Sequence, residues 1–447
     1  MMKKKFLYTP VKLVAVYLVL TLILFKWGAY SWNIEEPLFF WGLNLLYILS
    51  IILGYLWGVV IKAGKEKKVT FDPSDKSTRC FLNRVFLILA VLSVVCTYLE
   101  TVRSLGLSTM SPAAILAQAK TALEHPAEWY AYTYSDDFFG NYGGKIFSVL
   151  VLIIQPMLYA VIPLTIFWSD ILKLYNKILG GTVIGMQMAK WIVSGKNKGI
   201  FDIAIYIGIV LIIKIFRDRL KNGKMSLRSK LAFLLMIIGG VFVIAKFGNT
   251  INARLGGNWE TYTVAGYSVN PDSPLLKMLP EALKGLLVYL TLYLTQGYQA
   301  MSLITNMPWI PLWGIGYSKF IVEYIGRYFN IDIASLTYQY RLREYGWDPD
   351  LNWHSLYLYI ANDTGLIGCA IVLFFLGILL GITYYEALYQ SSALSLLLLI
   401  QLCVICLYIP ANNIIFNHIG SFVTFYVIFF LWLFRKMHLN RKIKGFR

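Results

Sequence analysis

Long apolar stretches separated by short polar connectors dominate the chain. A helix needs about 20 apolar residues to cross a hydrocarbon layer about 30 Å thick, so each stretch near this length predicts a transmembrane helix. Ten stretches qualify: residues 11–30, 37–61, 81–102, 146–168, 177–195, 199–216, 231–247, 355–384, 391–409 and 414–434. The pattern therefore predicts an all-α polytopic membrane protein.

An eleventh apolar stretch, at 284–305, conflicts with the alternation of inside and outside, because a crossing there would place the basic C-terminal segment outside. We predict a re-entrant or interface-lying helix, a form tolerated where protein or a water-filled cavity surrounds the backbone. The alternative is a full span paired with a second crossing near "WIPLWGIGYSKFIVEYIG" (309–326). The expected number of transmembrane helices is therefore about 10 to 12.

Charge gives the expected orientation. The formal net charge is +18, which in a soluble protein would suggest a nucleic-acid partner. Here the Lys and Arg residues cluster beside the apolar stretches, at 3–5, 62–84, 217–230 and 435–447. Such clusters mark the cytoplasmic side of a membrane. We therefore expect both termini in the cytoplasm, an uncleaved signal anchor at 11–25, and no nucleic-acid partner.

This orientation divides the chain into three expected regions: an N-terminal transmembrane bundle (1–247), a large extracytoplasmic loop (248–354), and C-terminal transmembrane helices with a cytoplasmic tail (355–447). The loop contains seven Lys and Arg against eight Asp and Glu, so bulk charge does not explain it. It is rich in Tyr and Trp, which suit the membrane–water interface and also suit stacking on sugars.

Three arginines are candidates for binding a diphosphate at the outer membrane boundary: Arg254, Arg341 and Arg343. A guanidinium presents several fixed donors that match phosphate oxygens. The structural alternative is that Arg254 extends to lipid headgroups and that Arg341 pairs with Glu344 or Glu323 on a helix face. Both interpretations remain open at this point.

His354 is the candidate general base, because its reference pKa of about 6.5 leaves it largely neutral at neutral pH. Asp363 follows nine residues later and could orient or balance a second polar group. A histidine at a helix start is more often a cap or an interface residue. The "DPD" at 348–350 is a D-x-D pattern that can hold a divalent metal, but the proline between the aspartates favours a turn. We expect no metal and no cofactor.

A family resemblance enters through three segments. "HSLYLYIANDTGLIG" (354–368) is similar to the "H-N-x-y-L … E-x-G-l-i-G" segment of bacterial O-antigen polymerases and ligases. "YLTQGYQAMSL" (293–303) and "GIGYSKF" (314–320) resemble the oligosaccharide repeat-unit polymerase, or Wzy-type, branch. Two departures are visible: Ser355 stands where asparagine is common, and the R-x10-G spacing is missed by one residue between Arg254 and Gly266.

The resemblance implies a lipid-donor (GT-C-like) glycosyltransferase of the bacterial inner membrane that is inverting and metal-independent. It implies a polyprenyl-diphosphate-linked oligosaccharide as donor and acceptor, with membrane lipid and a chain-length regulator protein as further partners. His354 and Asp363 match the catalytic positions, and Arg254 with Arg341 or Arg343 match the diphosphate-binding positions. Tyr298, Gln299 and Trp353 are the candidate glycan-binding residues.

Two alternatives remain. A ligase would differ only in its acceptor. A flippase for lipid-linked oligosaccharides would instead require polar residues along a path through the spans, and Lys–Glu pairs at mid-membrane depth are nearly absent from the ten stretches.

Overall fold

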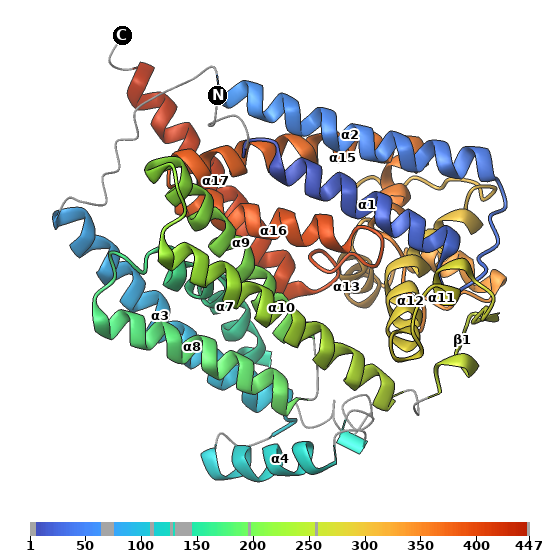
Figure 1. Cartoon of the computed structure of the whole chain (residues 1–447), viewed down its shortest axis with the longest axis horizontal. Helices are drawn as coiled ribbons and strands as arrows, with labels where there is room; N and C mark the ends of the chain where they lie inside the picture. Colours follow the sequence, from blue (N-terminus) through green and yellow to red (C-terminus); the bar gives the residue numbers. More distant parts are fainter. Residues whose placement is uncertain are drawn as a thin grey trace. The chain divides into compact units, whose positions relative to one another are not determined.

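The computed structural model describes residues 6–63, 76–107, 111–125, 128–129, 145–194, 198–254 and 258–444. The described chain is mostly helical (Figure 1). Its longer helices are α1 (Thr9–Trp27), α2 (Pro37–Ala63), α3 (Lys76–Ser104), α4 (Pro112–Glu124), α7 (Lys145–Phe167), α8 (Leu174–Val193), α9 (Lys198–Asn222), α10 (Leu227–Arg254), α12 (Glu281–Leu303), α13 (Lys319–Phe329), α15 (Leu356–Tyr389), α16 (Ala393–Tyr408) and α17 (Ile419–Lys444). The shorter elements are η2 (Trp259–Thr261), β1 (Thr263–Val264), β2 (Tyr267–Ser268), α11 (Pro274–Lys277), η3 (Ala334–Leu336), α14 (Tyr338–Arg341) and η4 (Leu342–Tyr345).

Each of the ten predicted stretches coincides with a helix. Within the described residues, seven helices have segments long and apolar enough to cross a membrane: Thr9–Trp27, Pro37–Ala63, Lys76–Ser104, Val149–Phe167, Lys198–Asn222, Leu356–Tyr389 and Ile419–Met437. Ala393–Tyr408 is apolar but shorter. These helices confirm the prediction of a helical protein with several membrane-spanning segments, whereas the number of 10 to 12 and the orientation stay predictions.

The helices form two compact units that interleave along the sequence. The first unit comprises Met1–Glu66, Gly248–Glu386 and Gln401–Phe422, and the second comprises Lys67–Phe247, Ala387–Ile400 and Val423–Arg447. The three regions expected from the sequence followed chain order. In the structure, α1 and α2 belong to the same unit as the segment 248–354, and this unit contains the candidate site residues.

Small residues bring α2 and α15 into backbone contact within the first unit (Figure 1). Each helix carries two glycines four residues apart: Gly54 and Gly58 on α2, Gly377 and Gly381 on α15. A Cβ atom on Gly54 would lie 1.9 Å from the carbonyl oxygen of Phe374 on the facing helix, so only glycine permits this approach. Paired G-x-x-x-G motifs of this kind pack helices in membranes. The sequence analysis did not single them out.

Helix α12 corresponds to the eleventh apolar stretch and packs against the chain between α1 and α2. One polar face of α12 bonds to this connector: Thr291 accepts from Ala29 N, Thr295 from Trp32 Nε1 and Ser302 from Glu35 N, while Gln299 Nε2 donates to Asn33 O. The part of α12 from Thr291 to Ser302 therefore lies beside the connector between α1 and α2. Its position relative to a membrane stays a prediction.

The alternative of a second crossing at 309–326 is wrong. The structure has a loop followed by α13, which is 11 residues long. At 1.5 Å per residue such a helix extends about 16 Å, roughly half of a hydrocarbon layer.

The small β-hairpin before α12, β1 paired with β2, turns through Ala265 and Gly266, both with positive φ.

In the second unit, α3 packs against α7 and α8, and α7 packs against α9. Lys190 of α8 forms an ion pair of 2.6 Å with Glu100 of α3, and Gln187 donates to the same carboxylate. Both charged residues lie about one helical turn from the ends of their helices, a distance of about 5–6 Å along the helix axis. The pair could not be predicted from the sequence, because its members are 90 residues apart. The expected near absence of such pairs at mid-membrane depth stays a prediction.

Candidate functional site

His354 lies in the extended segment that leads into α15. Its side chain is only 2% exposed, and its Nε2 atom has no hydrogen-bond partner within the described part of the chain. The ring of Tyr359 meets the imidazole edge-on, with 6.4 Å between ring centroids. Burial, assisted by the positive charge of Lys319, lowers the pKa of His354 to about 3. The imidazole is therefore neutral at physiological pH, with a free nitrogen.

Lys319, whose charge acts on this histidine, belongs to a cluster of charged side chains at the surface. Its Nζ atom lies 3.1 Å from Asp350 Oδ1, and Arg343 Nη2 lies 2.9 Å from the other oxygen of the same carboxylate. The hydrogen bond from Lys319 is the main reason why the pKa of Asp350 is lowered. The Asp350 carboxylate thus pairs with both Lys319 and Arg343.

The D-x-D pattern forms the turn that its proline suggested. Asp350 N donates to Asp348 Oδ1 at 2.9 Å, and Arg343 lies 3.6 Å from the same Asp348 oxygen. In the residues that the structure describes, no group of three or more His, Cys, Asp or Glu side chains is arranged to hold a metal ion. The two aspartates are engaged with cationic side chains.

The start of α13 is joined to the loop between α16 and α17. Lys319 N donates to Asn417 Oδ1 at 3.1 Å, Ser318 Oγ donates to Phe416 O, and Asn413 Nδ2 donates to Tyr317 O at 2.6 Å. These bonds fix the backbone of Lys319. Since Asn417 also hydrogen-bonds Tyr359, the loop connects the lysine to the ring beside His354.

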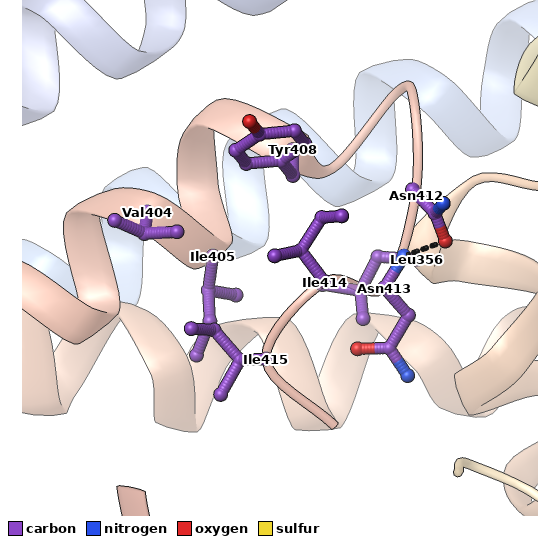
Figure 2. A pocket seen from close by; sticks show the side chains of 8 residues that line it. All are labelled: Leu356, Val404, Ile405, Tyr408, Asn412, Asn413, Ile414 and Ile415. Carbon is purple, nitrogen blue, oxygen red and sulfur yellow. Dashed lines mark hydrogen bonds between the residues drawn. The ribbon is translucent and has the colours of Figure 1, made fainter. Parts of the chain in front are cut away.

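A narrow recess, too small to hold a water molecule, lies beside the same loop. Figure 2 shows its lining: Leu356, Val404, Ile405, Tyr408, Asn412, Asn413, Ile414 and Ile415. The Asn413 backbone N–H donates to the Asn412 side chain at 2.7 Å. Most of the lining is aliphatic and the recess has no room for a ligand, so it is not a candidate site for a diphosphate.

Asp363 binds backbone amides. Its Oδ1 atom accepts from the N–H groups of Gly314, Ile315 and Gly316 at 2.8, 3.1 and 2.9 Å. Two residues later, Gly365 interrupts α15 with φ 70° and ψ 169°. These bonds attach the loop before α13 to α15 at this interruption, which is a structural role that the sequence analysis did not foresee.

Asn362 is the buried centre of the same attachment. Its Nδ2 donates to Gly316 O and to Gln339 Oε1, both at 2.9 Å, and its Oδ1 accepts from Tyr338 N at 2.9 Å. Sequence reasoning missed both Asn362 and Lys319. The only available signal for Asn362 was a polar residue inside an apolar run, and its partners lie 23–46 residues away.

The three candidate arginines have different surroundings. Arg343 stacks over the Tyr340 ring at 4.7 Å in addition to its ion pairs. Arg341 Nη1 donates to Pro308 O at 2.9 Å, and its guanidinium lies 4.7 Å from the centroid of the Tyr338 ring. Arg254 is the last residue of α10, and its side chain lies outside the described residues. Arg343 therefore shares the Asp350 carboxylate with Lys319, and Arg341 lies against Tyr338, whose backbone N–H bonds Asn362.

Two of the three candidate glycan-binding residues are in the core. Tyr298 is fully buried, and its hydroxyl shares a hydrogen bond of 2.9 Å with Thr21. Gln299 is also fully buried and donates to the Tyr267 hydroxyl at 2.9 Å. Trp353 is partly exposed, so of the three it is the one that a glycan could reach without rearrangement. Glycan contact stays a prediction for all three.

No protein-family model, curated protein or solved structure matches this chain. The interpretation of the site therefore depends on the geometry above and on the resemblance carried by residues 293–303, 314–320 and 354–368.

Proposed function

We propose that the protein is a membrane glycosyltransferase that polymerises polyprenyl-diphosphate-linked oligosaccharide repeat units on the outer face of a bacterial cytoplasmic membrane. The observation that carries the proposal is the buried, neutral His354, whose Nε2 has no partner among the described residues, together with the positive charge of Lys319, which acts on the imidazole. A general base must be unprotonated, and a diphosphate leaving group requires positive charge nearby.

In the proposed reaction, an acceptor hydroxyl attacks the anomeric carbon of the donor glycan. The new C–O bond forms as the bond between that carbon and the diphosphate oxygen breaks, and the diphosphate leaves with the electron pair. His354 Nε2 takes the hydroxyl proton. Attack opposite the leaving group inverts the anomeric centre, and the step needs neither metal nor cofactor.

The low pKa of His354 makes the free imidazole a weak base. A bound diphosphate would place negative charge close to the imidazole, and a nearby opposite charge favours the protonated form. Donor binding would thereby raise the basicity of His354 and offset the effect of Lys319. Arg343, Arg341 and Arg254 are the proposed diphosphate contacts. Asp363, with Oδ1 on three backbone amides, would hold the site together rather than transfer a proton.

The Glu100–Lys190 pair in the second unit supports a second candidate function, a flippase for lipid-linked oligosaccharides. Buried ionisable pairs between membrane helices often mark a transport path. Both residues nevertheless lie near the ends of their helices, and the pair is hydrogen-bonded to Gln187. We therefore favour the polymerase. A ligase would use the same donor chemistry with another acceptor.

The test is a reconstitution of the purified protein in liposomes with a synthetic polyprenyl-diphosphate-linked repeat unit. A polymerase produces a ladder of products that differ by one repeat unit. A ligase produces a single transfer, and only when another acceptor is supplied. A flippase moves the lipid to the other leaflet without forming a new glycosidic bond, and this outcome would contradict the proposal.

A further inference from the structure

Helix α12 contacts the chain immediately on both sides of His354. On the N-terminal side, the backbone N–H of Trp353 donates to Gln296 Oε1 at 3.1 Å. On the C-terminal side, Gly297 faces Ser355 so closely that a Cβ atom on Gly297 would lie 2.4 Å from Ser355 N. The same Cβ would lie 2.2 Å from the carbonyl oxygen of Pro410. Two consecutive residues of α12 therefore determine where the histidine segment lies.

Two further bonds complete the restraint of this segment. Trp347 Nε1 donates to Trp353 O at 3.3 Å, and Leu356 N donates to Ile409 O at 2.8 Å. The backbone is thus held at both neighbours of His354, whereas the Nε2 of the imidazole has no hydrogen-bond partner among the residues that the structure describes. The orientation of the imidazole, and so the direction in which Nε2 points, therefore depends on the backbone and on side-chain packing.

Helix α12 can serve as a fixed support because it is itself bonded to the connector between α1 and α2. Thr291 and Thr295 accept hydrogen bonds from this connector, and both are fully buried. Gln296 is 5% exposed. A change at Gln296 or Gly297 should therefore move the histidine segment rather than the helix.

We propose that Gln296 and Gly297 are positioning residues that hold His354 in its reactive place, Gln296 through the Trp353 N–H and Gly297 through its missing side chain. The inference rests on the proposed function for the role of His354. A misplacement of about 1 Å at a catalytic group can lower a rate about 10²-fold. If the two residues only packed the core, their replacement would change stability and leave the turnover of each folded molecule unaltered.

The test compares four variants in detergent and in liposomes. Gln296→Leu removes the acceptor, Gln296→Glu keeps an oxygen at that place, and Gly297→Ala adds the clashing Cβ. Gly285→Ala on the same helix is the matched control, since the atoms nearest to its Cβ would belong to the Trp259 side chain, at 3.3 Å or more, and not to backbone. The measurements are kcat and KM for ladder formation, thermal stability, and labelling of His354 by diethyl pyrocarbonate, followed by mass spectrometry.

Gln296→Leu and Gly297→Ala should lower kcat about 10²-fold with little change in KM, and both should increase the labelling of the buried imidazole. Gln296→Glu should retain most of the turnover, and Gly285→Ala should resemble the wild type. If Gly297→Ala does not fold, the positioning role is tested by comparing turnover and labelling between Gln296→Leu and Gln296→Glu.

Wild-type turnover and labelling in both Gln296→Leu and Gly297→Ala, together with an inactive His354→Ala, would overturn the positioning role and leave the proposed function standing. An active His354→Ala would instead remove the proposed function. The labelling arm needs no glycan substrate, so unchanged labelling counts against the positioning role even if the protein forms no polymer.

Discussion

At the scale of single residues, the buried imidazole of His354 should make the fold sensitive to acid. Its pKa is about 3 in the folded protein, against an ordinary value of 6.5. Between these values the unfolded chain binds a proton that the folded chain does not bind. The free energy of unfolding is therefore unaffected by this group above about pH 6.5, and it decreases as the pH falls from 6.5 toward 3.

The corresponding measurement is thermal unfolding in detergent between pH 7.5 and 4.5. Protonation of His354 in the unfolded chain can lower the free energy of unfolding by up to about 1.4 kcal/mol for each pH unit below pH 6.5. His354→Gln, which cannot take up the proton, should show a shallower decline than the wild type. Parallel declines in the two proteins would mean that the imidazole is not buried in solution.

Asp363 allows a second residue-scale prediction. Asp363→Ala leaves three backbone N–H groups without their acceptor. Gly314 N is exposed and can bond water, so the cost falls on the part-buried N–H groups of Ile315 and Gly316, at up to about 1–3 kcal/mol for an unsatisfied group. Asp363→Asn keeps an oxygen at the same place and should lose less stability. Turnover of each folded molecule should follow the same order. If Asp363 were instead an acid–base catalyst, both variants would lose turnover equally while the asparagine variant kept its stability.

The sequence alone could single out His354, because a histidine at the start of an apolar run is unusual. It could also predict the turn at Asp348 and Asp350 from local chemistry. It could not predict the place of Lys319, because besides its local pair with Glu323 this lysine bonds Asp350, 31 residues away, and Asn417, 98 residues away. Nor could it predict that Tyr298 is buried, since tyrosine is equally common at interfaces and in cores.

At the scale of helices, the contact between α2 and α15 depends on glycine. Gly54→Ala places a Cβ against the backbone of the facing helix and should cost about 1–3 kcal/mol, the usual cost of overpacking. Gly42→Ala lies on the same helix with open space around it, so it should be neutral or slightly stabilising. The check is thermal unfolding of both variants. Equal stabilities would show that the two helices are not in backbone contact.

The helices themselves were predictable because their length and apolar composition are local properties of the sequence. Pairing between helices was not, since Gly54 and Gly377 are far apart in the chain. The position of α12 was only partly predictable. That α12 does not cross a membrane stays a prediction from the alternation of the charged connectors, whereas its attachment to the α1–α2 connector depends on single hydroxyl and amide groups.

At the scale of the whole molecule, the account requires both termini inside and the segment 248–354 outside. Cysteines introduced at Asn258 and Asp332, both exposed positions, should react with an impermeant thiol reagent in intact spheroplasts. The native Cys80 is exposed at the start of α3 and should react only after the membrane is opened. Protection of the two introduced cysteines until lysis would reverse the orientation.

The central claim is that His354 is the base of a glycan-polymerising reaction, and the most direct test is the turnover of His354→Ala in the liposome assay. The account predicts a folded variant that still binds the lipid-linked donor but forms the glycan ladder about 10²- to 10⁴-fold more slowly, the usual contribution of a positioned base. His125→Ala, at an exposed histidine, should match the wild type. A folded His354→Ala that builds polymer at the wild-type rate would contradict the account.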